Sequence, residues 1–301
     1  MIEIRSVSKS FGPIRAVRDV TLYIKEKTIF GLVGTNGAGK STLLRMMSGV
    51  LRADRGIIRI DQENIYDNPL AKVKIFFVSD DFYFLPNSTG EEMALYYRGL
   101  YPNFDMSFFC RLMESFSLGK NRKISTLSKG MKKQLALILG LAAKSPYLFC
   151  DEAFDGLDPA ARQLAKSIFA AEMEERGLAV VISSHNLREL EDVSDQIGIL
   201  HEGGILLAEN LEFLRQKRQK IQLVFASEED RKRFESGVKV LLARRQGHMM
   251  VYTIEGTKEA LEETLSKCRT IYVERLYLSL EELFISEMEV VGYDVGKFIQ
   301  A

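Results

Sequence analysis

A glycine-rich loop between an apolar strand and a helix constrains the fold of this 301-residue chain more than any other feature. Residues 34–41 fit the pattern G-x-x-x-x-G-K-[ST], in which a loop surrounds the phosphates of a nucleotide. The residues before it, 28–33, are apolar and β-branched and predict a buried strand, whereas residues 40–50 predict a helix. The glycines allow successive backbone N–H groups to face inward, toward the positive end of the helix dipole. The loop therefore predicts an α/β fold with a polyphosphate site at a strand–helix junction.

Lys40 stands in the first turn of that helix, where its positive charge opposes the helix dipole. A bound polyphosphate would reverse the sign of this interaction, which favours phosphate binding over a solvated surface lysine. Ser41 would direct its hydroxyl to a Mg²⁺ ion. The predicted nucleotide-binding residues of the loop are Gly34, Thr35, Asn36, Gly37, Ala38, Gly39, Lys40, Ser41 and Thr42.

Two carboxylates, Asp151 and Glu152, follow a second apolar strand that begins at residue 147. Ligands of open α/β sheets bind at the carboxyl ends of the strands, so both acids are expected near the phosphates. Asp151 is predicted to hold Mg²⁺, and Glu152 to act as the general base that polarises the attacking water. The alternative, two solvated acids in a turn, is disfavoured because the phosphate loop is also present.

A third strand is predicted at residues 178–183 and leads into Ser184 and His185. The chain has three histidines, and a lone histidine is more often structural than functional. The order of the surrounding motifs favours a contact between His185 and the γ-phosphate.

In this order, the motifs resemble those of the ATP-binding cassette (ABC) ATPases over residues 1 to about 215. GTNGAGKST resembles the Walker A motif, and YLFCDE resembles the Walker B motif with its catalytic glutamate. LSKGM at 127–131 resembles the signature loop, GLD at 156–158 the D-loop, and His185 the switch histidine. Phe11 is similar to the aromatic residue that stacks on adenine, although a core phenylalanine is the alternative.

The resemblance implies a P-loop ABC-type fold, with a RecA-like core, an antiparallel β subdomain and a helical subdomain at about residues 81–145. It also implies that two cassettes meet head to tail. ATP and Mg²⁺ bound at one Walker A loop would then be covered by Ser128, Lys129 and Gly130 of the other cassette. Taken alone, LSKGM could be only the capped start of a helix.

Three positions depart from the family pattern. Asp80 follows the strand predicted at 73–79, where the family usually has glutamine. A carboxylate is a stronger Mg²⁺ ligand than an amide, so Asp80 is a predicted metal ligand and turnover should depend more steeply on Mg²⁺. Lys129 replaces a signature glycine and either compensates the charge of Asp80 or points to solvent; Met131 replaces a glutamine.

Residues 1–215 form the predicted nucleotide-binding domain, and residues 216–301 form a predicted small α+β accessory domain. The pattern in the second part is strand, helix, strand, strand, helix, strand, helix, which is compatible with a ferredoxin-like split βαβ.

Composition excludes several classes of protein. Lys+Arg and Asp+Glu both number 41, which argues against a nucleic-acid partner. The 3 cysteines form no C-x-x-C pair, which argues against a disulfide framework or a zinc site. No apolar run reaches about 18 residues and no secretory signal is evident, so a cytoplasmic location is expected.

These features predict an ATP-hydrolysing subunit that powers a separately encoded membrane permease, of exporter type. The subunit would lie at the inner face of the cell membrane and act in a homo- or heterodimer of cassettes. The alternatives are a soluble ABC ATPase with a non-transport role and a regulatory module without turnover. Retention of Glu152 disfavours the regulatory module.

Overall fold

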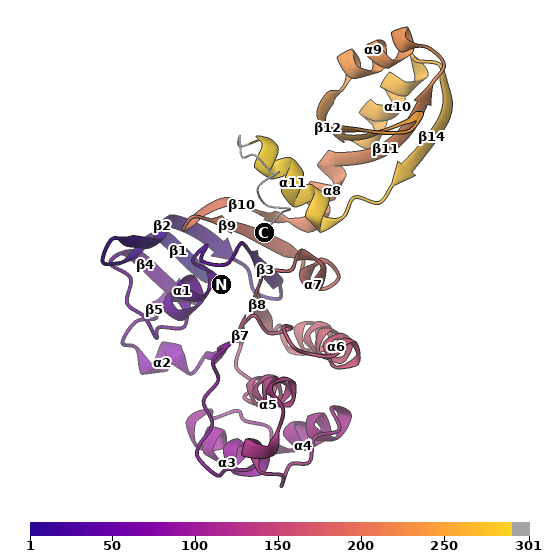
Figure 1. The fold of residues 1–301 in the computed structure, drawn as a ribbon. Coiled ribbons are helices and arrows are strands. Elements are labelled where there is room, and N and C mark those ends of the chain that lie inside the picture. Colours follow the sequence, from indigo (N-terminus) through magenta and orange to yellow (C-terminus); the bar gives the residue numbers. More distant parts are fainter. Residues whose placement is uncertain (291–301) are drawn as a thin grey trace. The chain divides into compact units, whose positions relative to one another are not determined.

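The chain divides into two compact units, residues 1–208 and residues 209 onward, and the computed structural model describes residues 1–290 (Figure 1). The boundary predicted at 215/216 falls inside helix α8 (Leu211–Lys217). Asn210 caps this helix by accepting a hydrogen bond from the N–H of Phe213, so the second unit begins before the predicted boundary.

The N-terminal unit contains most of the elements. In chain order they are β1 (Ile2–Phe11), β2 (Ile14–Ile24), β3 (Ile29–Val33), α1 (Lys40–Met47), β4 (Arg55–Ile60), β5 (Glu63–Asn64), α2 (Pro69–Lys72), β6 (Ile75–Val78), α3 (Gly90–Leu100), α4 (Met106–Ser115), a short 3₁₀ turn (Ile124–Thr126), α5 (Lys129–Ala142), β7 (Tyr147–Asp151), α6 (Pro159–Arg176), β8 (Ala179–Ser184), α7 (Leu187–Glu191), β9 (Gln196–His201) and β10 (Gly204–Asn210).

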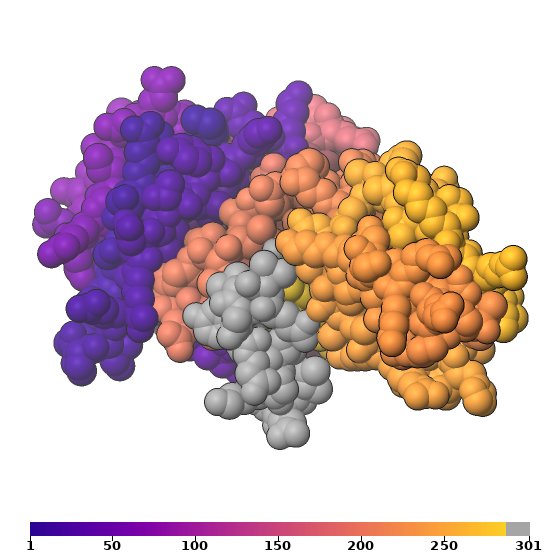
Figure 2. All heavy atoms as spheres, turned by 90° about the horizontal axis from the view of Figure 1, so that it is seen from above, coloured from indigo at the N-terminus to yellow at the C-terminus, as the bar shows by residue number. Residues whose placement is uncertain are grey.

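Two sheets organise this unit. The first is antiparallel, with the order β2-β1-β4-β5, and its residues form much of the indigo surface in Figure 2. The second has the order β10-β9-β3-β8-β7-β6, and its neighbouring pairs from β9 to β6 are parallel. The carboxyl ends of β3, β7 and β8 therefore meet at one edge of the sheet, where an α/β fold places its ligand.

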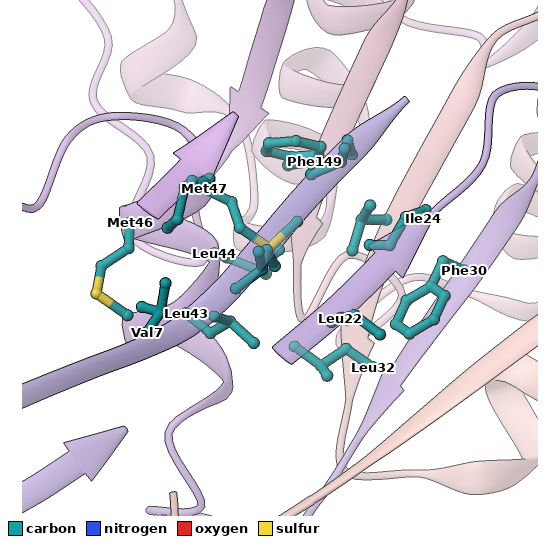
Figure 3. Close-up of a cluster of buried hydrophobic side chains, with 14 of the residues drawn as sticks. Val7, Leu22, Ile24, Phe30, Leu32, Leu43, Leu44, Met46, Met47 and Phe149 are labelled. Atoms are coloured by element: carbon teal, nitrogen blue, oxygen red, sulfur yellow. The ribbon is translucent and has the colours of Figure 1, made fainter. Parts of the chain in front are cut away.

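A single buried core joins the two sheets through α1 (Figure 3). The side chains involved come from β1, β2, β3, α1 and β7, and include Val7, Leu22, Ile24, Phe30, Leu32, Leu43, Leu44, Met46, Met47 and Phe149. Because α1 begins at the glycine-rich loop, the packing of its apolar face also fixes the position of that loop.

Helices α3, α4 and α5 form the helical segment expected between residues 81 and 145 (Figure 1). Thr89 and Glu92 make the predicted capping box at the start of α3, with hydrogen bonds of 3.2 and 2.7 Å. Asp105 caps α4 by accepting from the N–H of Phe108 at 2.8 Å. The predicted α/β core, antiparallel sheet and helical segment are confirmed.

The C-terminal unit continues from α8 with β11 (Arg218–Phe225), α9 (Glu228–Gly237), β12 (Lys239–Gln246), β13 (Met249–Glu255), α10 (Lys258–Ser266), β14 (Thr270–Leu276) and α11 (Leu280–Val290). Its sheet has the order β12-β13-β11-β14, and every neighbouring pair is antiparallel. A separate core, Ile221, Leu223, Phe234, Tyr252, Ile254 and Leu261, lies between the sheet and helices α9 and α10. This topology is the ferredoxin-like split βαβ.

In the part of the chain that the structure describes, no helix combines the length and apolar character needed to cross a bilayer.

Replacement of Leu44 by alanine should lower the free energy of unfolding of the N-terminal unit by about 2–5 kcal/mol, because the side chain is fully buried and would leave a cavity. Urea unfolding followed by circular dichroism measures the change. Leu70→Ala is the matched control, since Leu70 is 75% exposed and its loss should change stability by less than about 0.5 kcal/mol. Equal losses in the two variants would contradict the assignment of the core.

Candidate functional site

The glycine-rich loop leaves the carboxyl end of β3 and closes at the first turn of α1. Gly39 caps the helix with φ +105°, and a Cβ atom there would lie 2.2 Å from the carbonyl oxygen of Ala16. A Cβ atom at Gly34 would lie 2.3 Å from the carbonyl oxygen of Leu200. Both glycines are therefore required by backbone contacts that press the loop against neighbouring strands.

The ammonium of Lys40 lies inside the loop, and its side chain is only 5% exposed. It donates to the carbonyl oxygens of Gly34 at 2.7 Å and Thr35 at 3.3 Å, and pairs with Glu152 Oε1 at 3.3 Å. A buried cation needs such partners. The ammonium of Lys40 thus contacts both the loop and Glu152, which follows β7. The oxygens of a bound phosphate would compete with these acceptors for the ammonium.

Asp151 is a buried carboxylate held by two hydroxyl groups. Ser41 donates to its Oδ1 at 3.0 Å and Ser183 donates to the same atom at 2.6 Å. Within the described residues it forms no ion pair. An anion buried among neutral donors lacks a counter-charge, and hard oxygen ligands suit Mg²⁺, so Ser41 and Asp151 fit a magnesium ion.

No group of three acidic, histidine or cysteine side chains in the described part of the chain could hold a metal on its own. Mg²⁺ usually keeps several waters and takes phosphate oxygens as ligands, so a two-residue protein contribution is sufficient for it.

Glu152 and His185, which follow the neighbouring strands β7 and β8, contact each other. His185 Nδ1 lies 2.9 Å from Glu152 Oε2, and the His185 backbone N–H donates to the same oxygen at 3.3 Å. The other carboxylate oxygen faces Lys40. Glu152 therefore lies between the loop lysine and the histidine, which is the position that a general base next to the γ-phosphate requires.

Asp80 lies at the end of β6 and contacts Lys133 of α5, whose ammonium donates to its Oδ1 at 3.0 Å. The same ammonium donates to the carbonyl oxygen of Glu152 at 2.7 Å. Lys129, which the sequence analysis considered as the compensating charge, is exposed at the start of α5. Within this chain Lys133, one helical turn further on, pairs with Asp80, while compensation by Lys129 and the role of Asp80 as a metal ligand stay predictions.

An open pocket of about 660 Å³ lies at the glycine-rich loop, and Asp151, His185 and Lys133 are outside its lining. It is lined by Pro13, Ile14, Arg15, Ala16, Arg18, Thr35, Asn36, Gly37, Ala38, Gly39, Lys40, Ser41, Thr42, Asp80, Glu152 and Glu202. Phe11 is 48% exposed at the end of β1 and is outside this lining, so its stacking on adenine stays a prediction.

The signature segment lies outside the pocket lining and begins α5. Ser128 is its N-cap and accepts a hydrogen bond from the N–H of Met131 at 3.2 Å. A Cβ atom at Gly130 would lie 2.7 Å from the carbonyl oxygen of Gly156, so the start of α5 touches the loop before α6. Residues 128–130, which were predicted to bind nucleotide, therefore form a surface that is separate from the pocket of this chain.

Two residues at the site, Ser183 and Lys133, were not predicted. Lys133 precedes the buried residues Leu137 and Leu141 by one and two helical turns, so the helical period places it on the buried face of α5. That spacing is a signal for a buried lysine. Ser183 lies in an apolar strand run, where nothing in the sequence distinguishes it from a packing residue.

Cys150 precedes the two acids and is fully buried in β7. Burial, together with the charge of Asp151, raises the pKa of its thiol well above the usual range. The thiol stays protonated beside the site and serves as an apolar packing group.

Comparisons with known proteins agree on one family. The protein-family model described as "ABC transporter" matches residues 17–155. The ABC transporter ATP-binding protein YtrB of Bacillus subtilis is 30% identical over 287 residues, which cover 95% of this chain and 98% of that protein. The bacitracin transport ATP-binding protein BcrA of Enterococcus faecalis is 30% identical over 225 residues, 73% of this chain and 72% of that protein. A solved dimeric structure of a bacterial ABC transporter cassette superposes with a TM-score of 0.63 and 25% identity, over 70% of this chain and 99% of that one.

Replacement of Ser183 by alanine should lower ATP turnover about tenfold. The hydroxyl donates to Asp151 and accepts the N–H of Glu152 at 3.0 Å, and an unsatisfied buried group costs about 1–3 kcal/mol. Steady-state phosphate release measures the effect. Ser167→Ala, which removes an exposed hydroxyl on α6, should leave turnover unchanged. Wild-type turnover in Ser183→Ala would contradict this role.

Proposed function

This chain belongs to the ABC transporter ATP-binding proteins and is an ATPase, and from that membership we propose that it powers a separately encoded membrane permease of exporter type. The observation that carries the proposal is the convergence of Lys40 and His185 on the carboxylate of Glu152. A phosphate-binding cation and a general base at one pocket, with a histidine in contact with that base, are parts that ATP hydrolysis requires.

Glu152 is the proposed general base. Its carboxylate is partly buried between Lys40 and His185, and it lines the pocket. His185 would orient the attacking water and the γ-phosphate, and its side chain is exposed enough to reach both.

Mg²⁺ bound by Ser41 and Asp151 would neutralise negative charge on the phosphates. The chain itself binds and orients the nucleotide. Lys40 and the inward-facing N–H groups of the loop would hold the phosphates, while the hydroxyls of Ser41 and Ser183 keep the Asp151 carboxylate in place.

A second cassette is proposed to complete the site. Ser128, Lys129 and Gly130 form the start of a helix that exposes its N-terminal end, and that end favours an anion. Because this surface lies outside the pocket of its own chain, it is available to cover the nucleotide of a second cassette. The second cassette is either another copy of this chain or a related one.

An aromatic hollow is the proposed contact with the permease. It has a volume of about 300 Å³ and lies between the loop after β6 and helices α3 and α5. Tyr83 and Tyr96, both in its lining, are strongly exposed, and Leu100 completes an apolar rim. An exposed apolar patch of this kind marks an interaction site, and a short amphipathic helix of a membrane protein fits it.

The exporter assignment is supported by the relatives. BcrA is named for the transport of bacitracin, and the first 30%-identical relative, YtrB, matches this chain over both of its units. We therefore propose that the permease moves an amphiphilic compound of the peptide-antibiotic class out of the cell.

Glu152→Gln should retain ATP binding, abolish turnover and produce a dimer that depends on ATP, because the amide preserves the shape of the side chain but cannot accept the proton. Phosphate release and size-exclusion chromatography with and without ATP measure the two effects. Glu175→Gln, at an exposed position near the end of α6, is the control and should behave as wild type. Normal hydrolysis by Glu152→Gln would remove the assignment of the base.

Replacement of both Tyr83 and Tyr96 by alanine should preserve basal ATPase activity but abolish copurification with the partner membrane permease. Tyr23→Ala removes an equally exposed tyrosine of β2 and should keep that association. Wild-type copurification in the double variant would contradict the proposed contact. Cosedimentation of the wild-type protein with ribosomes, in place of a permease, would favour the soluble ABC ATPase.

A further inference from the structure

Lys133 is a buried cation that contacts the segment carrying Glu152 and is outside the lining of the nucleotide pocket. Its side chain is 1% exposed, and within residues 1–290 its ammonium donates to a carboxylate oxygen of Asp80 and to the backbone carbonyl of Glu152. A lysine loses its hydration on burial and is tolerated only when its protons find acceptors. Both acceptors belong to the edge of the ATP site.

The backbone of Glu152 is held in an uncommon conformation. Its φ of +48° lies in the left-handed region, which is unfavourable for a residue with a side chain. Such a conformation persists when the surroundings determine it. Here the N–H donates to Ser183 Oγ at 3.0 Å, and the carbonyl accepts from the N–H of Asp155 at 3.2 Å and from Lys133 at 2.7 Å.

This conformation sets the position of the Glu152 carboxylate. With the peptide held on both sides, Oε1 lies 3.3 Å from the ammonium of Lys40 and Oε2 lies 2.9 Å from His185 Nδ1. Loss of the charged hydrogen bond to the carbonyl would allow the peptide to rotate. A shift of the carboxylate by about 1 Å is enough to impair a general base severely.

Asp80 gives Lys133 a second task. Its side chain is 46% exposed and lines the pocket, so an uncompensated carboxylate would repel the anionic nucleotide. The ammonium of Lys133 neutralises this carboxylate from within the protein, so Asp80 acts here as a paired charge at the edge of the pocket and not as a Mg²⁺ ligand.

We propose that Lys133 is a positioning residue for ATP hydrolysis. It holds the peptide of Glu152 in the left-handed conformation and neutralises Asp80 at the edge of the pocket. The inference rests on the proposed role of Glu152 as the base. The two contacts act on different kinetic parameters: the bond to the carbonyl acts on kcat, and the charge beside Asp80 acts on the KM for ATP.

Four variants separate the two contacts. Lys133→Met removes both and should lower kcat by about tenfold or more and raise the KM for ATP by about threefold or more. Asp80→Asn/Lys133→Met also removes the unpaired carboxylate, so the KM should return to the wild-type value while kcat stays low. Asp80→Asn/Lys133→Gln restores a hydrogen-bond donor in a neutral pair, so both parameters should return to within about threefold of wild type. Lys132→Met, a change of the partly exposed neighbour on the same helix, is the control and should leave both parameters unchanged.

A purely structural role for Lys133 would lower the amount of folded protein without separating kcat from KM. Wild-type kcat in Asp80→Asn/Lys133→Met, or no recovery in Asp80→Asn/Lys133→Gln, would overturn the proposal. If Lys133→Met does not fold, the comparison of Lys133→Gln with Asp80→Asn/Lys133→Gln carries the test, and equal kinetics of these two variants would overturn it.

The same measurements distinguish this inference from the proposed function. Hydrolysis that survives in Glu152→Gln would remove the general base and, with it, the proposed function of the site. Inactive Glu152→Gln together with a wild-type kcat in Asp80→Asn/Lys133→Met would remove only the role of Lys133.

Discussion

The ion pair between Lys40 and Glu152 depends on the order of the strands in the central sheet. The two residues follow β3 and β7, and β8 lies between these strands and supplies Ser183 and His185. Because the three strands are parallel, three segments that are distant in the chain end at the same edge. The glycine loop, the two acids and the histidine acquire a common site from this arrangement, and a different strand order would separate them.

The backbone segments that form the site could be predicted from the sequence, because each of them is specified by residues within the segment. A glycine loop before a helix, acids after an apolar strand and a serine ahead of an apolar helix each act through the backbone of their own segment. The helix caps at Thr89 and Asp105 were predictable for the same reason. The boundary between the two units was predicted less accurately. Helix α8, which Asn210 caps, spans the change in composition from which that boundary was predicted.

The residues that escaped prediction act through tertiary contacts. Ser183 is one of several small or apolar residues in β8, and only its distance to Asp151 gives it a role. Lys133 is a second residue whose role depends on tertiary contacts. The sequence marks Asp80 as an unusual carboxylate and suggests Lys129 as its counter-charge. Within this chain, packing of α5 against β6 and β7 supplies the buried ammonium of Lys133 instead.

The contact between Gly130 and Gly156 has a mechanical consequence. The carbonyl oxygen of Gly156 occupies the place of a side chain at position 130, so the first turn of α5 and the loop before α6 are already at the limit of approach. A displacement of one segment toward the other is transmitted to it, because backbone atoms that are already in contact cannot move closer. The signature segment and the loop of residues 156–158 are therefore expected to move together as one unit.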